Sequence, residues 1–327
     1  MLSLTDAYRQ GHDMSVLLIS HPTCRGHDPG HGHPESPARL GAIGDQLIAS
    51  GLDGLLHHLE APAATREQLL RVHTGRYLDA LEAARPEAGH AALDPDTALS
   101  PGSLEAARHA AGAVVMAVDR VIHGDVRRAF CAVRPPGHHA EPARAMGFCL
   151  YNNIAVGTAH ALAVHGLARV AIVDFDVHHG NGTEAVFRDE PRVLLCSTFE
   201  HPLYPDSGAD TQSAHIVNVP LPAGTDGASY RRAFEARILP ALEAFKPELL
   251  MVSAGFDGHR EDPLAHLTLV EDDYDWITRR LIDLAERHCG GRLVSALEGG
   301  YALPALGRSV AAHVKALLEY APAQRTS

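Results

Sequence analysis

Short apolar runs alternate with longer amphipathic stretches along almost the whole chain. The runs are rich in Val, Ile, Leu and Ala, and they lead into polar residues, glycine or proline. Such runs are typical of strands that are buried on both faces of a parallel sheet. The pattern predicts strands at 15–20, 129–133, 170–173, 191–198, 216–221, 249–254 and 292–297.

The stretches between these runs predict helices that cover the sheet. The expected helices are 37–50, 66–85, 103–123, 153–165, a segment that starts near 182, 228–245, 271–288 and 304–320. This alternation predicts an α/β fold with a parallel sheet covered on both faces. No linker, low-complexity segment or repeat interrupts it. We therefore expect a single domain over residues 1–327, with a motif-bearing core of about 15–320.

Several of the predicted strands end in clusters of polar residues. These clusters lie at 134–139, 174–181, 257–259 and 298–301. The carboxyl ends of parallel strands meet at one edge of the sheet, where open α/β sheets bind their ligands. We therefore expect the clusters to form one active site.

The cluster after strand 170–173 contains candidate metal ligands. If the chain stays extended beyond Asp174, then Asp174, Asp176 and His178 project to one side, because side chains alternate along a strand. Carboxylate oxygen and imidazole nitrogen bind Zn²⁺ and similar ions. The same residues would also suit a solvated turn whose side chains cap the helix that begins near Gly182.

Asp257 follows another apolar strand and makes a third metal candidate beside Asp176 and His178. Three protein ligands leave a position open for water and substrate, which is the signature of a catalytic zinc site. No cysteine lies in these clusters, which argues against a closed thiolate site. Taken alone, Asp257 also fits a plain turn between Phe256 and Gly258.

Two adjacent histidines, His138 and His139, lie on a loop that Pro135 and Pro136 stiffen. Beside a metal ion, one or both could act as general base toward water and then as general acid toward a leaving group. The alternative is a pair that faces solvent. Tyr301 follows two glycines and could donate its hydroxyl to a developing oxyanion. Otherwise it is a partly buried core residue.

Composition narrows the class of protein. The formal net charge of −12 argues against nucleic-acid binding and would suit a cationic partner. No apolar run reaches the length of about 18 residues that a membrane span needs. Residues 1–14 mix acidic and basic side chains, unlike a secretory signal. The 5 cysteines are scattered without a CxxC pair, so we expect a cytoplasmic protein with reduced thiols.

Histidine is unusually frequent, with 23 residues, and several of them lie in the loop 21–33. This loop also carries glycine, proline and acidic residues. We expect its histidines to pack and cap the loop rather than to bind metal, because glycine and proline between them do not fix one convergent geometry.

Together the polar clusters resemble the zinc-dependent histone deacetylase family, which includes acetylpolyamine amidohydrolases and acetoin-utilisation proteins. The matching stretches occur in family order over about residues 15–320. They are Arg134-Pro-Pro-Gly-His-His-Ala140, Gly147-Phe-Cys149, Asn152-Asn153, Asp174-Phe-Asp-Val-His-His-Gly-Asn-Gly-Thr183, Ser253-Ala-Gly-Phe-Asp257 and Glu298-Gly-Gly-Tyr301. The Asp-Phe-Asp and Glu-Gly-Gly-Tyr forms are similar to those of the class II branch and its bacterial relatives.

The resemblance implies the arginase/deacetylase fold, a single α/β domain with a parallel sheet of eight strands. It implies one Zn²⁺ ion held by Asp176, His178 and Asp257. It also implies that His139 is the general base and acid, that His138 is its electrostatic partner, and that Tyr301 polarises the acetyl carbonyl.

The same resemblance implies a structural K⁺ ion. Asp174 would orient His138 and would also help to bind K⁺, together with Ser197 and the backbone of Asp176, His178 and Thr198. Asn181 stands near the place where the class I branch has an aspartate facing the second histidine. That exchange removes a charge and should leave His139 less basic.

Residues that match the family's acyl-lysine tunnel are expected to contact substrate. Phe148, beside Gly147, matches one aromatic wall, and Tyr204 matches the other, where phenylalanine is more usual. Leu264 falls at the gatekeeper position, where a glutamate would favour polyamines. Asp94 or Asp96 would anchor the substrate backbone at the rim.

The expected function is removal of acetyl or other acyl groups from acyl-lysine in proteins or peptides. A second hypothesis is an amidohydrolase for acetylpolyamines or other small acylated amines, with Glu200 or Asp206 binding the cation. A third is a non-catalytic, zinc-dependent module that binds acylated ligands. An arginase-like binuclear site would need more carboxylates than the clusters contain. Fe²⁺ would suit the same ligands as Zn²⁺, and the sequence is compatible with a homo-oligomer.

Overall fold

The computed structural model describes residues 16–319, and its centre is one large sheet. Its eight strands all run parallel. From edge to edge they are β2 (Leu56–Glu60), β1 (Val16–Ser20), β5 (Arg128–Cys131), β10 (Leu293–Leu297), β9 (Leu249–Ala254), β6 (Val170–Asp174), β7 (Val193–Glu200) and β8 (Ile216–Leu221). A short antiparallel pair, β3 (Ala91–Ala92) and β4 (Ala98–Leu99), stands apart.

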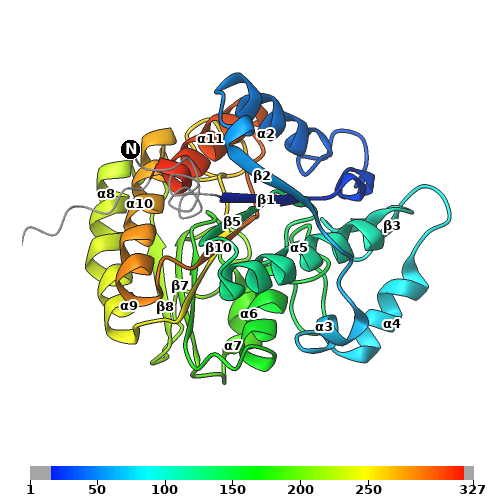
Figure 1. Cartoon of the computed structure of the whole chain (residues 1–327). Helices are drawn as coiled ribbons and strands as arrows, with labels where there is room; N and C mark the ends of the chain where they lie inside the picture. The colour runs from blue at the N-terminus through cyan, green and yellow to red at the C-terminus, as the bar shows by residue number, and fades with distance from the viewer. Residues whose placement is uncertain (1–15, 320–327) are drawn as a thin grey trace, which may run out of the picture.

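Helices cover both faces of this sheet, as the alternating pattern predicts. Figure 1 shows α5, α6 and α7 on one side of the sheet and α8, α9 and α10 on the other. The helices are α2 (Ala38–Ala49), α3 (Arg66–Leu70), α4 (Gly75–Ala84), α5 (Ser103–His123), α6 (Asn153–Ala163), α7 (Asn181–Phe187), α8 (Gly227–Ala233), α9 (Leu239–Phe245), α10 (Glu271–His288) and α11 (Leu303–Glu319). The α/β class and the parallel sheet are therefore confirmed. The expectation for residues 1–14 lies outside the described residues.

One strand of the large sheet, β2, gives no signal in the sequence. Its residues Leu-His-His-Leu-Glu include His57 and His58, both exposed. The strand lies at the edge of the sheet and pairs only with β1. An edge strand meets water on one side, so it needs no continuous apolar run.

Two predicted helices are interrupted. The stretch 66–85 divides into α3 and α4, because the Thr74 side chain accepts a hydrogen bond from the Tyr77 backbone and starts a new helix. The stretch 228–245 contains a π-helical turn, Phe234–Ile238, between α8 and α9. Pro240 follows this turn and has no N–H to donate, which removes one bond of the α-helical ladder.

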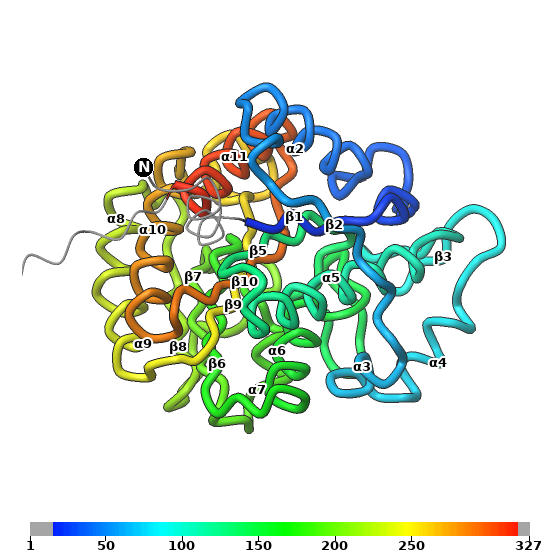
Figure 2. Tube along the Cα trace, in the orientation of Figure 1, coloured from blue at the N-terminus to red at the C-terminus, as the bar shows by residue number. Residues whose placement is uncertain are grey.

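The core lies between the sheet and its two helical layers. Side chains of the central strands, such as Ile172 and Met251, are fully shielded from water. The first and last α-helices of the described chain, α2 and α11, pack side by side (Figure 2). Polar residues begin where the central strands end, so their side chains are concentrated at the carboxyl edge of the sheet.

Two other expectations concern the chain as a whole. Among residues 16–319, no helix combines the length and the apolar character that a membrane span requires. All five cysteines, Cys24, Cys131, Cys149, Cys196 and Cys289, are buried and free of disulfide bonds.

Replacing Gly112 by alanine should destabilise the protein. An added Cβ would overlap the carbonyl oxygen of Pro62, where α5 passes close to that backbone. Overpacking of this kind costs about 1–3 kcal/mol in the free energy of unfolding. Denaturant unfolding followed by circular dichroism measures the change.

Gly44→Ala is the matched control, because Gly44 lies within α2 and an added Cβ would meet no atom within 4 Å. That variant should be stabilised by about 0.5–1 kcal/mol, since alanine favours a helix more than glycine does. Equal changes in the two variants would contradict the close approach at Gly112.

Candidate active site

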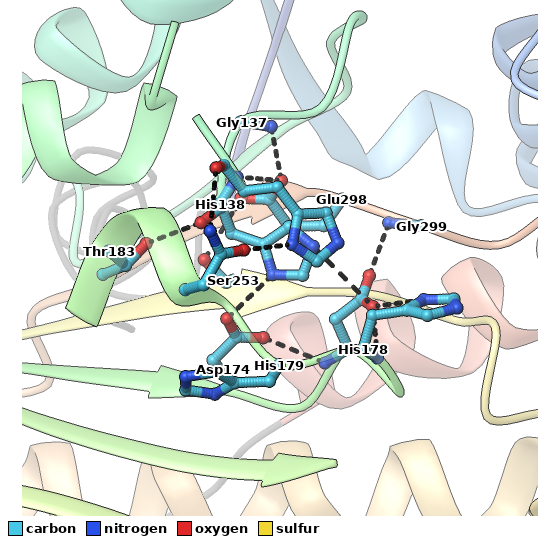
Figure 3. Close-up of polar contacts among 12 residues, drawn as sticks. Gly137, His138, Asp174, His178, His179, Thr183, Ser253, Glu298 and Gly299 are labelled. Atoms are coloured by element: carbon cyan, nitrogen blue, oxygen red, sulfur yellow. Dashed lines mark hydrogen bonds and ion pairs between the residues drawn. The ribbon is translucent and has the colours of Figure 1, made fainter. Parts of the chain in front are cut away.

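The loops that follow β5, β6, β9 and β10 meet at the carboxyl edge of the sheet. These four strands are consecutive neighbours in the order β5-β10-β9-β6, so their ends lie side by side. Figure 3 shows His138 at these ends, with its imidazole hydrogen-bonded to Asp174 and its backbone N–H donating to the Glu298 carboxylate. The convergence expected from the sequence is therefore present.

Three donor groups at this edge have the spacing of a metal centre. His178 Nδ1 lies 3.2 Å from Asp176 Oδ1 and 3.1 Å from Asp257 Oδ2. Zn–N and Zn–O bonds of about 2.0–2.2 Å place two tetrahedral ligands a little over 3 Å apart. The donor types and their separations therefore fit one Zn²⁺ ion.

Backbone N–H groups hold the two carboxylates in place. Asp176 Oδ2 accepts a hydrogen bond of 2.8 Å from Gly299, and Asp257 Oδ1 accepts one of 3.0 Å from Val177. Each carboxylate thus keeps one oxygen on the backbone and directs the other toward His178. This arrangement fixes the donor atoms before any ion binds.

Charge at this centre also favours a cation. Burial and the nearby carboxylate of Asp176 together raise the pKa of Asp257 to about 7, although the hydrogen bond and charge of His178 oppose the rise. Burial alone would lower the pKa of His178, but hydrogen bonds and charge from Asp176 and Asp257 raise it well above its usual value. Two buried carboxylates with one imidazole leave negative charge that needs a positive partner.

Within the described residues, one other group brings three such side chains together: Asp119, His160 and His165. Asp119 belongs to α5, His160 to α6 and His165 to the segment that leads into β6, so this group is not part of the loops at the carboxyl edge. Asp119 Oδ1 is 2.8 Å from His160 Nε2 and 2.7 Å from His165 Nε2, which are hydrogen-bond distances. Arg71 donates to His160 Nδ1 at 3.0 Å, so Nε2 carries the proton that Asp119 accepts. This group is a hydrogen-bonded cluster.

The two adjacent histidines have different partners. His138 Nδ1 lies 2.9 Å from Asp174 Oδ2, whereas His139 Nδ1 lies 2.9 Å from the amide oxygen of Asn181. Their ring centroids are 4.0 Å apart. One histidine therefore has a carboxylate behind it, and the other has a neutral amide.

This difference in partners separates their protonation states. Burial alone would lower the pKa of His138, but the carboxylates of Asp176 and Asp174 raise it to about 10. Burial lowers the pKa of His139 well below its usual value, and charge on His138 and His178 lowers it further. His139 is consequently neutral and able to accept a proton.

Glu298 has a structural role that the sequence reasoning did not assign. Its buried carboxylate accepts hydrogen bonds from the backbone of Gly137 and His138 at 2.7 and 3.1 Å, and from Ser253 Oγ at 3.1 Å. Burial raises the pKa of Glu298 to about 7, while the charge of His138 opposes that rise. The sequence did carry one sign of this role, because Glu298 follows directly after a buried strand.

Tyr301 lies on the loop after β10, and contacts with Asp262 and Arg39 hold this loop in place. Asp262 Oδ2 accepts hydrogen bonds of 2.7 and 3.2 Å from the backbone of Tyr301 and Ala302. The Arg39 guanidinium lies 5.0 Å above the Tyr301 ring and also donates to the carbonyl oxygen of Gly300 at 2.7 Å. The sequence reasoning missed Arg39 and Asp262, which lie far from Tyr301 along the chain.

Two predicted tunnel residues contact the proposed catalytic side chains. The Phe148 ring meets Tyr301 edge-on with centroids 5.8 Å apart, and the half-exposed Tyr204 meets His139 at 5.2 Å. His33, from the histidine-rich loop, packs against Phe148 at 4.7 Å. Gly147 donates its backbone N–H to Asp96 at 3.1 Å.

Other predicted residues are placed less directly. Leu264 donates its backbone N–H to Asp262 at 3.1 Å, and its role at the tunnel mouth stays a prediction. Ser197 lies opposite Asp174 in the pairing of β6 with β7. Its buried Oγ has no hydrogen-bond partner among the described residues.

Comparison with known proteins agrees with this geometry. The model of the histone deacetylase domain matches residues 33–317. The chain is 43% identical over 277 residues to a histone deacetylase-like amidohydrolase of Pseudomonas aeruginosa, covering 83% of this chain and 73% of that protein. It is 38% identical over 328 residues to the polyamine deacetylase HDAC10 of Mus musculus, covering 95% of this chain and 47% of that protein.

A solved structure shows the same fold. The crystal structure of the HDA15 HD domain superposes with a TM-score of 0.88 at 36% sequence identity, over 93% of this chain and 89% of that one. The family model and these relatives cover most of the described residues. The chain therefore belongs to the histone deacetylase family, whose members are zinc-dependent hydrolases of amide bonds.

Proposed function

We propose that this protein removes acyl groups from the side-chain amine of acyl-lysine in peptides or proteins, as a single catalytic domain over residues 1–327. The observation that carries the proposal is the position of the neutral His139 beside the three donors Asp176, His178 and Asp257. A hydrolase of amides needs both an electrophilic ion and a base, and these residues offer the two within one buried site.

Asp176, His178 and Asp257 would hold the zinc ion. When bound there, zinc would supply Lewis acidity that polarises the acyl carbonyl and lowers the pKa of water from 15.7 toward about 7. Fe²⁺ is a second candidate for the same donors.

The protein's own side chains would move the protons. His139 would take a proton from the attacking water, because burial keeps its ring neutral. It would then return that proton to the departing amine, which releases acetate or another carboxylate. His138 would stay protonated against Asp174 and stabilise negative charge that develops nearby. Tyr301 would donate its hydroxyl to the oxyanion of the tetrahedral intermediate.

We also propose a structural K⁺ ion next to Asp174. Ser197, the carbonyl oxygens of Asp176, His178 and Thr198, and the Asp174 carboxylate would coordinate it. The buried and unpartnered Oγ of Ser197 supports this assignment, because a buried hydroxyl without a partner is costly.

The lining of the site favours acyl-lysine. Phe148 and Tyr204 offer two aromatic walls for an aliphatic chain, and Leu264 places no charge at the gatekeeper position. Of the two acids that could have bound a cationic amine, Glu200 is buried, and its oxygens already accept hydrogen bonds of 2.8 Å from the backbone and ring of His266. Asp206 remains exposed.

Small acetylated amines are the second candidate substrates. The similarity to a polyamine deacetylase and the acidic side chains of Asp94 and Asp96 near Tyr204 support them.

We also propose that the protein is cytoplasmic, because its five cysteines are buried and unpaired.

An acetyl-lysine peptide should be hydrolysed with a higher kcat/KM than an acetylated polyamine. The physical reason is that the aromatic rings of Phe148 and Tyr204 would pack along an aliphatic chain and that Leu264 carries no charge for a polyamine. Both substrates should be assayed side by side with the zinc-loaded protein, and His139→Ala should abolish turnover. A preference for the polyamine would contradict the proposed substrate class, and equal turnover by His139→Ala would remove that residue from the reaction.

Tyr301→Phe should lower kcat by about 100-fold or more, since loss of one oxyanion donor typically has this effect. Steady-state kinetics on the preferred substrate measures it. Tyr204→Phe is the matched control, because it removes a hydroxyl from the wall of the site and should leave kcat nearly unchanged. An unaltered kcat in Tyr301→Phe would show that its hydroxyl does not act on the oxyanion.

Asp257→Ala should lose bound zinc, because it removes one of the three donors. Elemental analysis of the purified protein should find one zinc ion per chain in the wild type and much less in this variant. Asp119→Ala, in the hydrogen-bonded cluster between α5 and α6, should keep the full content. The assignment fails if Asp257→Ala retains its zinc or if Asp119→Ala loses it.

A further inference from the structure

The amide of Asn181 lies between His139 and a second acid, Glu141. Its oxygen Oδ1 is 2.9 Å from His139 Nδ1, and its nitrogen Nδ2 donates to Glu141 Oε1 at 2.9 Å. Glu141 is half-buried, and its backbone N–H donates to the carbonyl oxygen of Arg144 at 2.9 Å in a tight loop. The side chain of Asn181 thus connects a carboxylate to the imidazole that would act as base.

An asparagine amide can present either its oxygen or its nitrogen to a given neighbour, so the surrounding groups decide its orientation. Around Nδ2 these groups are the Glu141 carboxylate, the Met146 sulfur at 3.3 Å and the His139 carbonyl oxygen at 3.5 Å. All three accept hydrogen bonds and none can donate one. The NH₂ group must therefore face them, and Oδ1 must face the imidazole.

This orientation decides which nitrogen of His139 carries the proton. Because Oδ1 only accepts, the neutral ring is stabilised with its proton on Nδ1. Nε2 is then the nitrogen with the free lone pair. If the amide turned over, its NH₂ group would face Nδ1 and stabilise the opposite tautomer, whose Nε2 cannot accept a proton from water.

We propose that Glu141 is a positioning residue that holds the Asn181 amide in this orientation and thereby selects the reactive tautomer of His139. The proposal rests on the proposed function of His139 as the base. Glu141 is the strongest of the three acceptors because it is the charged one. The sulfur and the carbonyl oxygen are weaker or more distant, so they cannot hold the amide as firmly alone.

Glu141→Leu should lower kcat by about 10-fold to 100-fold, the range that applies when an outer hydrogen-bond partner in a metal site is lost. KM should change little, because Glu141 would act through Asn181 and not on the substrate. Glu141→Gln keeps an acceptor oxygen and should restore most of the kcat. Glu67→Leu removes an exposed acid from α3 and should leave both constants unchanged.

A second variant separates this role from a merely structural one. In Asn181→Asp, the carboxylate can only accept from His139, so the tautomer is selected without Glu141. Two carboxylates then face each other across the 2.9 Å contact and repel. In this background, Glu141→Leu should raise kcat instead of lowering it. An equal loss in both backgrounds would overturn the proposal, since Glu141 would then act only on the loop.

The tautomer itself can be observed without turnover. Long-range ¹H–¹⁵N spectra of the zinc-loaded, ¹⁵N-histidine-labelled protein should show His139 protonated at Nδ1 in the wild type, with the signal assigned by its loss in His139→Gln. Glu141→Leu should populate the Nε2–H form. An unchanged tautomer would overturn the inference even if the wild type is active. A shifted tautomer in a protein that hydrolyses neither substrate would support it and reject the proposed function instead.

Discussion

The burial of several carboxylates at one edge of the sheet is the constraint on which the rest of this structure depends. Asp174, Asp176, Asp257 and Glu298 are all fully shielded from water. A buried charge is tolerated only with hydrogen bonds and an opposite charge. Backbone N–H groups of the strand-end loops supply the hydrogen bonds, and imidazoles or a cation must supply the charge. The loops therefore have little freedom to take any other path.

A second buried network extends from this centre to the opening loop of the chain. Glu35 accepts hydrogen bonds of 2.5 and 2.6 Å from Arg134 and one of 3.2 Å from Arg39. Arg39 in turn donates to the carbonyl oxygens of Glu298 and Gly300. These contacts connect the loop after β5, which carries the two histidines, with the loop after β10, which carries Tyr301. His139 and Tyr301, the proposed base and oxyanion donor, thus lie on loops that one set of buried ion pairs and hydrogen bonds connects.

The sequence by itself determined the fold class and the members of the central cluster. Apolar runs such as 170–173 and 249–254 can only be buried, and the polar residues after them then have to meet at the carboxyl edge. This reasoning placed Asp176, His178 and Asp257 together because each follows the end of a buried strand within a few residues. It could not find β2, whose position at the edge of the sheet removes the need for an apolar run.

Only the tertiary structure decided which groups support that cluster. Arg39, Asp262 and Glu141 hold the loop of Tyr301 or the partner of His139, yet none of them stands out from the other polar residues in the sequence. The structure also distinguished two His–Asp groups of similar composition: Asp176, His178 and Asp257 lie at the carboxyl edge of the sheet near His139, whereas in the Asp119 group the Arg71 guanidinium donates to His160. Local sequence fixes which residues leave a strand end, whereas hydrogen-bond partners depend on angstrom-scale distances between segments far apart in the chain. Those distances exist only once the sheet and its helices have packed.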